Sequence, residues 1–482
     1  ILKINILIKS KSISFTYSII PLIILILLLS FNVYVFGDNA LSGSNQFILL
    51  LGGAVASVVG FLNQTSYKEM LDKVADNFKS VAGAILILLF VGALAGSWLV
   101  SGIIPAMIYY GLKILHPSIF LPSCIIICAI ISLVCGSSWT TSATVGIALI
   151  GIGKALGIPS GMIAGAVISG AYFGDKLSPL SDTTNLSSAM TGTELFKHIK
   201  YMTLTTVPSI TITLIVFLII GFFHEQKGTT DIVKILNDIE LKFNINYWLF
   251  FVPAFVIFLI SKKTAPLIAL LAGTILGAIF ALIFQQEVVF ELSGESSNNY
   301  ISSYKGVLNA ITTGSQIETE NKLLYDLFYS GGMKGMLDTI WLIICAMVFG
   351  GVMESIGALK SITNSLLKLT KNTFQLFAST VASCLTVNLS ASDQYLAIVI
   401  PGKMFSRAYR DRKLAPENLS RTLEDSGTVT SALIPWNTCG AYQSGVLGVG
   451  VGEYFIYAIF NWLSPFMTLL YAGLKIKIKS LK

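Results

Sequence analysis

The stretch GDKLSPLSDTTN (174–185) places two aspartates, a lysine and five Ser, Thr or Asn residues between long apolar runs. Successive side chains of an α-helix are turned by about 100° from one another, so these consecutive polar residues cannot share one face. Pro179 also lacks a backbone donor and clashes with the preceding turn of a helix. We therefore expect this stretch to be the unwound middle of a broken helix that faces a polar cavity.

These residue types favour binding of a small hard cation such as Na⁺, because such ions prefer carboxylate, hydroxyl, amide and carbonyl oxygens. The candidate ligands in the stretch are Asp182, Ser181, Thr183, Asn185, Ser178 and Asp175. A buried carboxylate is either protonated or neutralised by a bound cation, so competition for one aspartate suffices to exchange Na⁺ for H⁺. Asp182 is the first choice as this shared carrier, because no cation lies within helical reach on its C-terminal side. The alternative for Asp175 is an ion pair with the adjacent Lys176 that only holds helices together.

Three further polar interruptions are candidates to complete the site. IPWNTCG (434–440) contributes Asn437 and Thr438, and the central parts of two apolar runs read CGSSWTTSATVG (135–146) and NLSASDQ (388–394). The candidate ligands in these two runs are Ser138, Thr140, Asn388, Ser392 and Asp393. We predict that Na⁺ binds at Asp182, Thr183 and Asp393, with Asp393 as the second choice for the shared carrier.

Two further acids, Glu424 and Asp425, lie about one or two helical turns before the second interruption. They are either proton relays or ion-pair partners of Arg421, and the sequence leaves both interpretations open.

Composition places these polar stretches in a membrane. Of the 482 residues, 54% are hydrophobic and only 12% are charged, and the mean hydropathy is +0.77. This composition disfavours a soluble enzyme. The net charge of +7 is better explained by basic residues in the short loops between spans than by nucleic-acid binding. None of the six cysteines forms a CxxC pair, so no disulfide framework and no zinc site are indicated. We expect no enzyme activity and no cofactor.

The apolar runs predict an all-α polytopic membrane protein. About ten crossings are expected, near 15–36, 46–62, 80–102, 159–190, 198–223, 247–261, 264–285, 337–358, 416–446 and 450–474. The runs 119–155 and 373–405 are each long enough for two half-depth helices that meet at the polar tip, as in a re-entrant hairpin.

The order of these elements repeats along the chain. We predict a first repeat over 1–223, a connecting loop over 224–246 and a second repeat over 247–482, each with one hairpin and one broken helix. Each repeat crosses the membrane an odd number of times, so the second copy is inverted. Inverted repeats with paired broken helices are typical of secondary transporters, whose binding sites lie where the interruptions meet.

The distribution of charge predicts the orientation. If the N-terminus is cytoplasmic, most lysines and arginines fall on the cytoplasmic side, including the pair Lys262 and Lys263 and the C-terminal tail. The loop over about 286–336 then lies outside and is rich in acids. Both termini are therefore expected in the cytoplasm.

The motifs SGAYFGDKLSPLSDTTN (169–185) and LEDSGTVTSALIPWNTCG (423–440) resemble those of the NhaC-type Na⁺/H⁺ antiporter family. GSSWTTSATVG (136–146) and SASDQYLAIVIPGKMF (390–405) strengthen the resemblance, which covers nearly the whole chain. It implies a multi-pass antiporter of the bacterial inner membrane that exchanges Na⁺ for H⁺, with related members that are often elevator-type homodimers.

Relatives in this family instead exchange organic solutes, such as malate for lactate. The alternative function is therefore ion-coupled antiport of small organic acids or amino acids, whose carboxylates Asn437, Thr438, Ser181 and Thr183 would hold equally well. A channel or a membrane sensor is a third hypothesis, which the symmetric broken helices disfavour.

Overall fold

A computed structural model describes residues 13–36, 40, 42–223, 232–297 and 299–481. These residues form helices joined by short connections, together with a two-stranded antiparallel sheet of β1 (Ser315–Gln316) and β2 (Tyr329–Ser330). Eight of the described helices are long and apolar enough to cross a membrane, or up to nine if a bent pair is counted as one span. The predicted class, an all-α polytopic membrane protein, is confirmed.

The helices of the first half are α1 Phe15–Phe36, α2 Ser44–Leu62, α3 Tyr67–Val100, α4 Ile103–Ile114, α5 Pro117–Cys135, α6 Ser138–Thr141, the π-helix η2 Ser142–Gly146, α7 Ile147–Ala155, α8 Ser160–Leu177, α9 Asp182–Thr191 and α10 Leu195–Phe223. They are followed by α11 Ile232–Lys242, η3 Tyr247–Phe250, α12 Phe251–Ser261, α13 Pro266–Phe284, α14 Gln286–Ser293, α15 Tyr300–Thr312, α16 Lys322–Leu327, η4 Lys334–Met336, α17 Leu337–Ser355 and α18 Ala358–Lys368. The last helices are α19 Thr373–Ala391, α20 Gln394–Asp411, α21 Pro416–Leu423, the π-helix η5 Glu424–Thr428, the 3₁₀-helix η6 Val429–Leu433, α22 Thr438–Leu447, α23 Val451–Tyr454 and α24 Ile459–Gly473.

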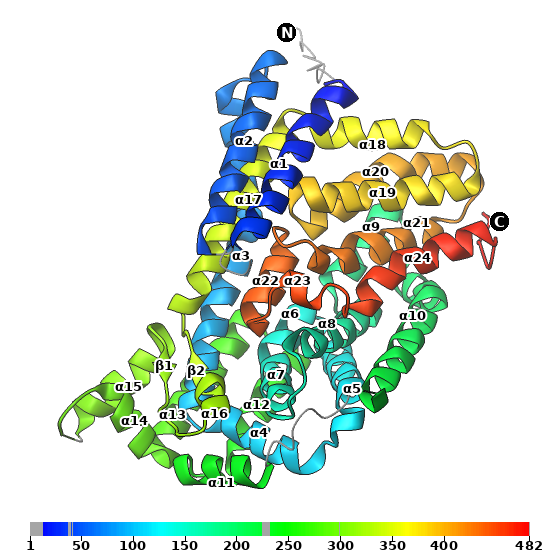
Figure 1. Ribbon diagram of the computed structural model, residues 1–482. Coiled ribbons are helices and arrows are strands. Elements are labelled where there is room, and N and C mark those ends of the chain that lie inside the picture. The colour runs from blue at the N-terminus through cyan, green and yellow to red at the C-terminus, as the bar shows by residue number, and fades with distance from the viewer. Residues whose placement is uncertain (1–12, 37–39, 41, 224–231, 298, 482) are drawn as a thin grey trace, which may run out of the picture.

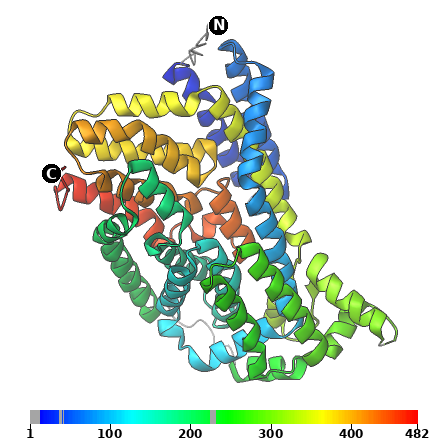
Figure 2. The same ribbon diagram turned by 180° about the vertical axis from the view of Figure 1, so that it is seen from behind.

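Helices α1, α2, α3 and α17 stand side by side along one flank of the molecule, as Figures 1 and 2 show. The 34 residues of α3 span about 50 Å, which is longer than the hydrocarbon core of a bilayer. The contact between α3 and α17 depends on Gly351, where a Cβ would lie 2.7 Å from the Cα of Val74. The flank is therefore a closely packed wall, and the hairpins and broken helices lie on one side of it.

Helix α8, which carries the first polar stretch, packs against α5. Two glycines one helical turn apart allow this contact, because a Cβ at Gly170 or Gly174 would lie 2.3 Å from the carbonyl oxygen of Ile125 or Ala129. The close approach brings the C-terminal end of α8 beside the polar tip that follows α5.

The helices are broken at the four polar stretches that the sequence singles out. The tips are Gly136, with φ of +68°, and Ser392, with φ of +59°, and each is followed by a side chain that caps the next helix. In the two broken helices the residue before each proline is extended, with ψ of 129° at Ser178 and 115° at Ile434. Proline therefore ends both half-helices by the same steric mechanism.

The positions of these interruptions are regularly spaced. Gly136 and Ser392 are 256 residues apart, and so are Ser178 and Ile434. A two-repeat organisation requires such a constant offset. The inversion of the second copy and the boundaries 1–223, 224–246 and 247–482 stay predictions.

The unwound segment is shorter than the sequence suggests. Helix α8 continues to Leu177 and α9 begins at Asp182, so only 178–181 leaves the helix and the expectation of an unwound 174–185 is wrong. The reason is a cap, because the Ser181 hydroxyl accepts the backbone N–H of Thr184 and starts α9 immediately.

Other segments also contain more helix than the sequence predicts. Of the connecting loop 224–246, residues 224–231 lie outside the described residues, and 232–242 form α11. The predicted outer loop contains α14, α15 and α16, and the hairpin arms α5 and α19 each have 19 residues. By length and composition these two arms are long enough to cross a membrane, whereas half-depth arms were expected.

Candidate ion-binding site

A cavity of about 470 Å³ lies where the first broken helix and the two hairpin tips meet α3 and the α12–α13 connection. Eight of the thirteen predicted binding residues line it: Asp175, Ser181, Asp182, Thr183, Ser138, Thr140, Asp393 and Thr438. Its wall also contains Ser137, Gln394, Tyr395, Lys263 and Thr264. The structure thus brings carboxylates and hydroxyls from both halves of the chain into one polar space.

Asp175 is buried in the cavity wall, at the C-terminal end of α8. One of its carboxylate oxygens, Oδ2, accepts hydrogen bonds from the backbone N–H of Ser138 at 3.0 Å and from the Ser138 hydroxyl at 2.7 Å. The first hairpin tip therefore fixes this carboxylate by two donors. The alternative ion pair with the adjacent Lys176 is wrong, because Lys176 binds a different acid on the far side of α8.

Asp182 also lines the cavity, as the first residue of α9, but its side chain is exposed. The expectation that this carboxylate is buried is therefore wrong. The break ends one residue earlier at the capping Ser181, whose hydroxyl lies 3.1 Å from that of Thr183, and both of these residues are buried. The neighbours of Asp182 are thus the enclosed hydroxyls, while Asp182 itself lies in the open part of the site.

Asp393 is the acid that the second hairpin tip supplies. It is buried, it caps α20, and its Oδ1 accepts the backbone N–H of Leu396 at 2.9 Å. The backbone N–H of Thr438 donates to the carbonyl oxygen of Ser392 at 2.9 Å, which joins this tip to the second break. The two halves of the chain therefore face each other across the cavity, with Asp175 and Asp182 from one and Asp393 from the other.

The remaining five predicted ligands do not line the cavity: Ser178, Asn185, Asn388, Ser392 and Asn437. Asn185 donates to the carbonyl oxygens of Pro179 and Ser181, and Asn437 donates to both oxygens of Asn388. Asn388 in turn donates to the carbonyl oxygen of Gly427 at 2.7 Å. These amides satisfy backbone groups that the breaks leave free, so they hold the shape of the interruptions.

Behind the cavity lies a second polar group, which we call the buried ionisable cluster: Lys176, Glu424 and Asp425. Lys176 forms an ion pair with Oδ1 of Asp425, and neither side chain is exposed. The other oxygen of Asp425 accepts hydroxyl hydrogen bonds from Thr205, at 2.8 Å, and from Thr468. The pair therefore joins α8, the π-helix η5, α10 and α24.

Glu424 is also fully buried, but it is less well paired than Asp425. Its Oε1 accepts the hydroxyl of Ser187 at 2.7 Å. Among the described residues no donor forms a well-aligned hydrogen bond to its Oε2, although the Thr428 hydroxyl also interacts with this carboxyl group. Of the two interpretations left open for these acids, the ion pair with Arg421 is wrong. The guanidinium of Arg421 instead lies 4.7 Å from the ring centroid of Tyr201 and 6.0 Å from that of Tyr471.

Sequence reasoning missed the partners of this cluster. Lys176 and Asp425 are 249 residues apart, and Thr205 and Thr468 come from two other helices. The sequence signal for these partners is a single hydroxyl residue within an apolar helix. This signal is weak, because it does not predict which hydroxyl donates to which acid.

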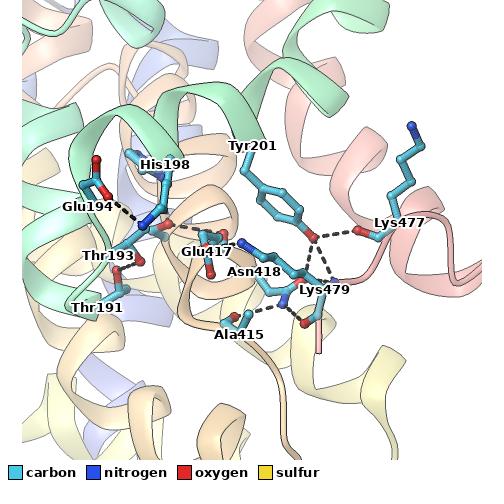
Figure 3. A network of polar contacts seen from close by, with 12 residues as sticks. Thr191, Thr193, Glu194, His198, Tyr201, Ala415, Glu417, Asn418, Lys477 and Lys479 are labelled. Carbon is cyan, nitrogen blue, oxygen red and sulfur yellow. Dashed lines mark hydrogen bonds and ion pairs between the residues drawn. The ribbon is translucent and has the colours of Figure 1, made fainter. Parts of the chain in front are cut away.

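The C-terminal segment covers the start of α21, the helix that leads to Glu424 (Figure 3). The hydroxyl of Tyr201 donates to Oδ1 of Asn418 at 2.6 Å and to the carbonyl oxygen of Lys477 at 2.7 Å. Lys479 forms an ion pair with Glu417 and accepts a hydrogen bond from Asn418 on its carbonyl oxygen. These contacts, which Figure 3 shows, hold the start of α21 without contributing a residue to the cavity.

The fold and the cavity define the class of this protein: a multi-pass membrane protein with the paired broken helices and central polar site that are typical of secondary transporters. Residues 170–476 match the model of the Na⁺/H⁺ antiporter family. The chain is 37% identical over 424 residues to the Na⁺/H⁺ antiporter NhaC of Alkalihalophilus pseudofirmus, covering 88% of this chain and 89% of that one.

Two relatives from Bacillus subtilis are nearly as similar. Its Na⁺/H⁺ antiporter NhaC is 35% identical over 411 residues, covering 85% of this chain and 88% of the relative. Its malate-2H⁺/Na⁺-lactate antiporter is 35% identical over 444 residues, covering 92% and 90%. The chain belongs to the Na⁺/H⁺ antiporter family, as its motifs predict.

Proposed function

We propose that this protein exchanges Na⁺ for H⁺ across the bacterial inner membrane by alternating access. The observation that carries this proposal is the single cavity in which Asp175, Asp182 and Asp393 meet the hydroxyls of both broken regions. Oxygen ligands of this kind suit a hard monovalent cation, and a carboxylate that binds the cation accepts a proton when the cation leaves. Na⁺ and H⁺ are the transported species, and no cofactor takes part.

The three acids have different parts in this mechanism. Asp182, which is exposed, meets the hydrated ion first, and the hydroxyls of Ser181 and Thr183 beside it replace water ligands. Asp175 and Asp393 are buried, so an uncompensated negative charge on either is costly. We assign the exchange to one of these two carboxyl groups, which holds either one Na⁺ or one proton. Competition between the two ions at that carboxyl group couples their opposite movements.

The cavity wall includes Lys263 and Thr264, in the α12–α13 connection that also carries Lys262. Basic connections face the cytoplasm in most membrane proteins, so we assign the open side of the cavity, and both termini, to the cytoplasm. From the family resemblance we also propose that the protein is a homodimer that works by elevator-type movement. The oligomeric mass of the purified protein in detergent tests whether it is a dimer.

Everted membrane vesicles test the proposed function directly. Addition of NaCl, with no organic solute present, should move protons in vesicles that contain the wild-type protein. The response should fall in Asp175→Asn and in Asp182→Asn, and it should stay at the wild-type level in Glu320→Gln, an exposed acid distant from the cavity lining. No response in the wild type, or an undiminished response in both aspartate variants, would contradict the proposal.

A second candidate is Na⁺- or H⁺-coupled antiport of small organic acids or amino acids. The cavity volume of about 470 Å³ favours it, because this is larger than a bare ion needs and falls in the range of small-molecule sites. The N-terminal ends of α9, α20 and α22 also border the cavity through Asp182, Gln394 and Thr438, and helix N-termini attract carboxylates.

Countertransport separates the two functions. Proteoliposomes loaded with unlabelled malate, lactate or an amino acid should accumulate the labelled solute only if the cavity carries it. Sodium-driven proton movement without any solute, together with no solute countertransport, would exclude the second candidate.

A further inference from the structure

Glu424 has no role in the cavity, yet it is a carboxyl group at the centre of the protein. It is fully buried, and in the part of the chain that the structure describes its Oε2 accepts no well-aligned hydrogen bond. An ionised carboxylate with such an oxygen in such a place is costly, whereas a protonated carboxyl group has one charge fewer to solvate. Its neighbours decide which of these two forms is present.

Lys176 and Asp175 on α8 and Cys384 on α19 act electrostatically on Glu424, and the hydroxyls of Ser187 and Thr428 interact with its carboxyl group. Asp425 is its neighbour on η5. Lys176 is the one cation among these groups, and it is already in an ion pair with Asp425. Asp425 also accepts the hydroxyls of Thr205 and Thr468, so Lys176 is held by a partner other than Glu424. Arg421 is turned to the rings of Tyr201 and Tyr471.

The cluster is linked to the cavity by two consecutive residues. Asp175 lines the cavity, and Lys176 reaches the other side of α8 to bind Asp425. The negative charge of Asp175 also acts on Glu424. A sodium ion beside Asp175 offsets that negative charge and so favours release of a proton from Glu424.

We infer that Glu424 is a second proton-binding site, separate from the cation cavity, and that it adds one proton to each sodium ion exchanged. This inference rests on the proposed Na⁺/H⁺ exchange. The Glu424 carboxyl group is protonated when the cavity holds no sodium, loses that proton from its O–H bond to water when sodium binds, and takes up another proton on the opposite side of the membrane. With one proton exchanged at the cavity carboxylates, the cycle moves two protons per sodium ion.

The ratio of protons to sodium ions tests this inference. The full chain is reconstituted in proteoliposomes, the membrane potential is held at zero with potassium and valinomycin, and the sodium gradient that stops net ²²Na⁺ flux is found at a set pH gradient. With two protons per sodium ion, one pH unit balances about a 100-fold sodium gradient, and with one proton it balances about a tenfold gradient. The wild type should show the first value and Glu424→Gln the second.

Two variants serve as matched controls. Glu424→Asp keeps a titratable group and should retain the wild-type balance. Glu417→Gln makes the same chemical change seven residues earlier, in α21, where the acid is paired with Lys479, and it should also retain that balance. If Glu424→Gln does not assemble, Glu424→Leu replaces the buried acid by an apolar side chain and should give the tenfold value.

The outcomes separate this inference from the proposed function. A wild-type protein whose sodium flux does not respond to the pH gradient overturns the proposed exchange itself. A wild type that balances at about tenfold, or a Glu424→Gln variant that balances at the same gradient as the wild type, overturns only the second proton site.

Discussion

The cavity and the buried ionisable cluster both contain carboxylates, but they neutralise them differently. In the cavity, Asp175 and Asp393 receive hydrogen bonds from hydroxyl and backbone donors, without a paired lysine or arginine. In the cluster, Asp425 has a permanent cation, Lys176, together with two threonine hydroxyls. The cluster therefore contains the cation that pairs with its acid, whereas Asp175 and Asp393 form no ion pair among the described residues.

Adjacent residues of α8 supply one member of each region. Asp175 contacts the first hairpin tip and Lys176 contacts η5, because successive side chains of a helix point in different directions. The cavity and the cluster are thus joined by two consecutive residues of one helix. The following predictions test this division, from the largest expected effect to the smallest.

Breaking the ion pair of the cluster should cost the most stability. Asp425→Asn leaves Lys176 buried without its partner, and the free energy of unfolding should fall by about 3–5 kcal/mol. Thermal or denaturant unfolding of the protein in detergent measures this. The double variant Lys176→Met/Asp425→Asn removes both charges and should recover most of the loss. A double variant no more stable than the single one would show that the pair is not the cause.

Within the cavity, the buried and the exposed aspartate should differ. Asp175→Asn weakens a site held by two donors, and the half-saturating Na⁺ concentration should rise about 10- to 100-fold, as expected for charged hydrogen bonds. Asp182→Asn removes an exposed charge, and the rise should stay within about fivefold. Sodium titrations of proton movement in vesicles measure both values. The reverse order would show that the exposed acid dominates binding.

The hydroxyl partners of Asp425 should contribute less than Lys176. Thr205→Val removes one donor to Oδ2, and the free energy of unfolding should fall by about 1–2 kcal/mol. Thr211→Val, on the same helix α10, is the matched control, because that hydroxyl is exposed and donates to the carbonyl oxygen of Val207. Equal losses in the two variants would mean that Asp425 gains nothing from Thr205.

The ion pair between Glu417 and Lys479 should contribute least. The Lys479 side chain is 48% exposed and the Glu417 side chain 7%, so water reaches one partner of this pair, whereas neither Lys176 nor Asp425 is exposed. Glu417→Gln should therefore change the free energy of unfolding by about 0–1 kcal/mol. A loss as large as that of Asp425→Asn would contradict the distinction between exposed and buried pairs on which the comparison rests.

The sequence located the interruptions well, for local reasons. Pro179 and Pro435 restrict the residue before them, and Gly136 permits the left-handed conformation, so each acts within its own turn of chain. The length of the break at 178–181 could not be predicted from the sequence. It depends on Ser181 starting α9 at once, and a polar stretch alone does not say where its cap lies.

The sequence alone does not show which of the polar residues line the cavity and which are exposed or bind backbone groups. Asp175 and Asp182 are equally polar in the printed chain, yet one is buried against Ser138 and the other is exposed. Ser178 and Ser392, which lie outside the cavity, have the same side-chain chemistry as Ser138 and Ser181, which line it. Which of them meets backbone and which meets the cavity depends on how the second half packs on the first.

By itself the sequence determined that this chain is a helical membrane protein with four polar interruptions, because hydropathy, proline and glycine act locally. Its motifs also indicated the family to which it belongs. Only the tertiary structure decided that Lys176 binds Asp425 rather than Asp175, and that one oxygen of Glu424 accepts no well-aligned hydrogen bond from the described residues. The physical reason is that charge pairing depends on distance in space. The pairs that matter here join residues about half the chain apart, and packing of the glycine-lined face of α8 on α5 orients the helix that connects them.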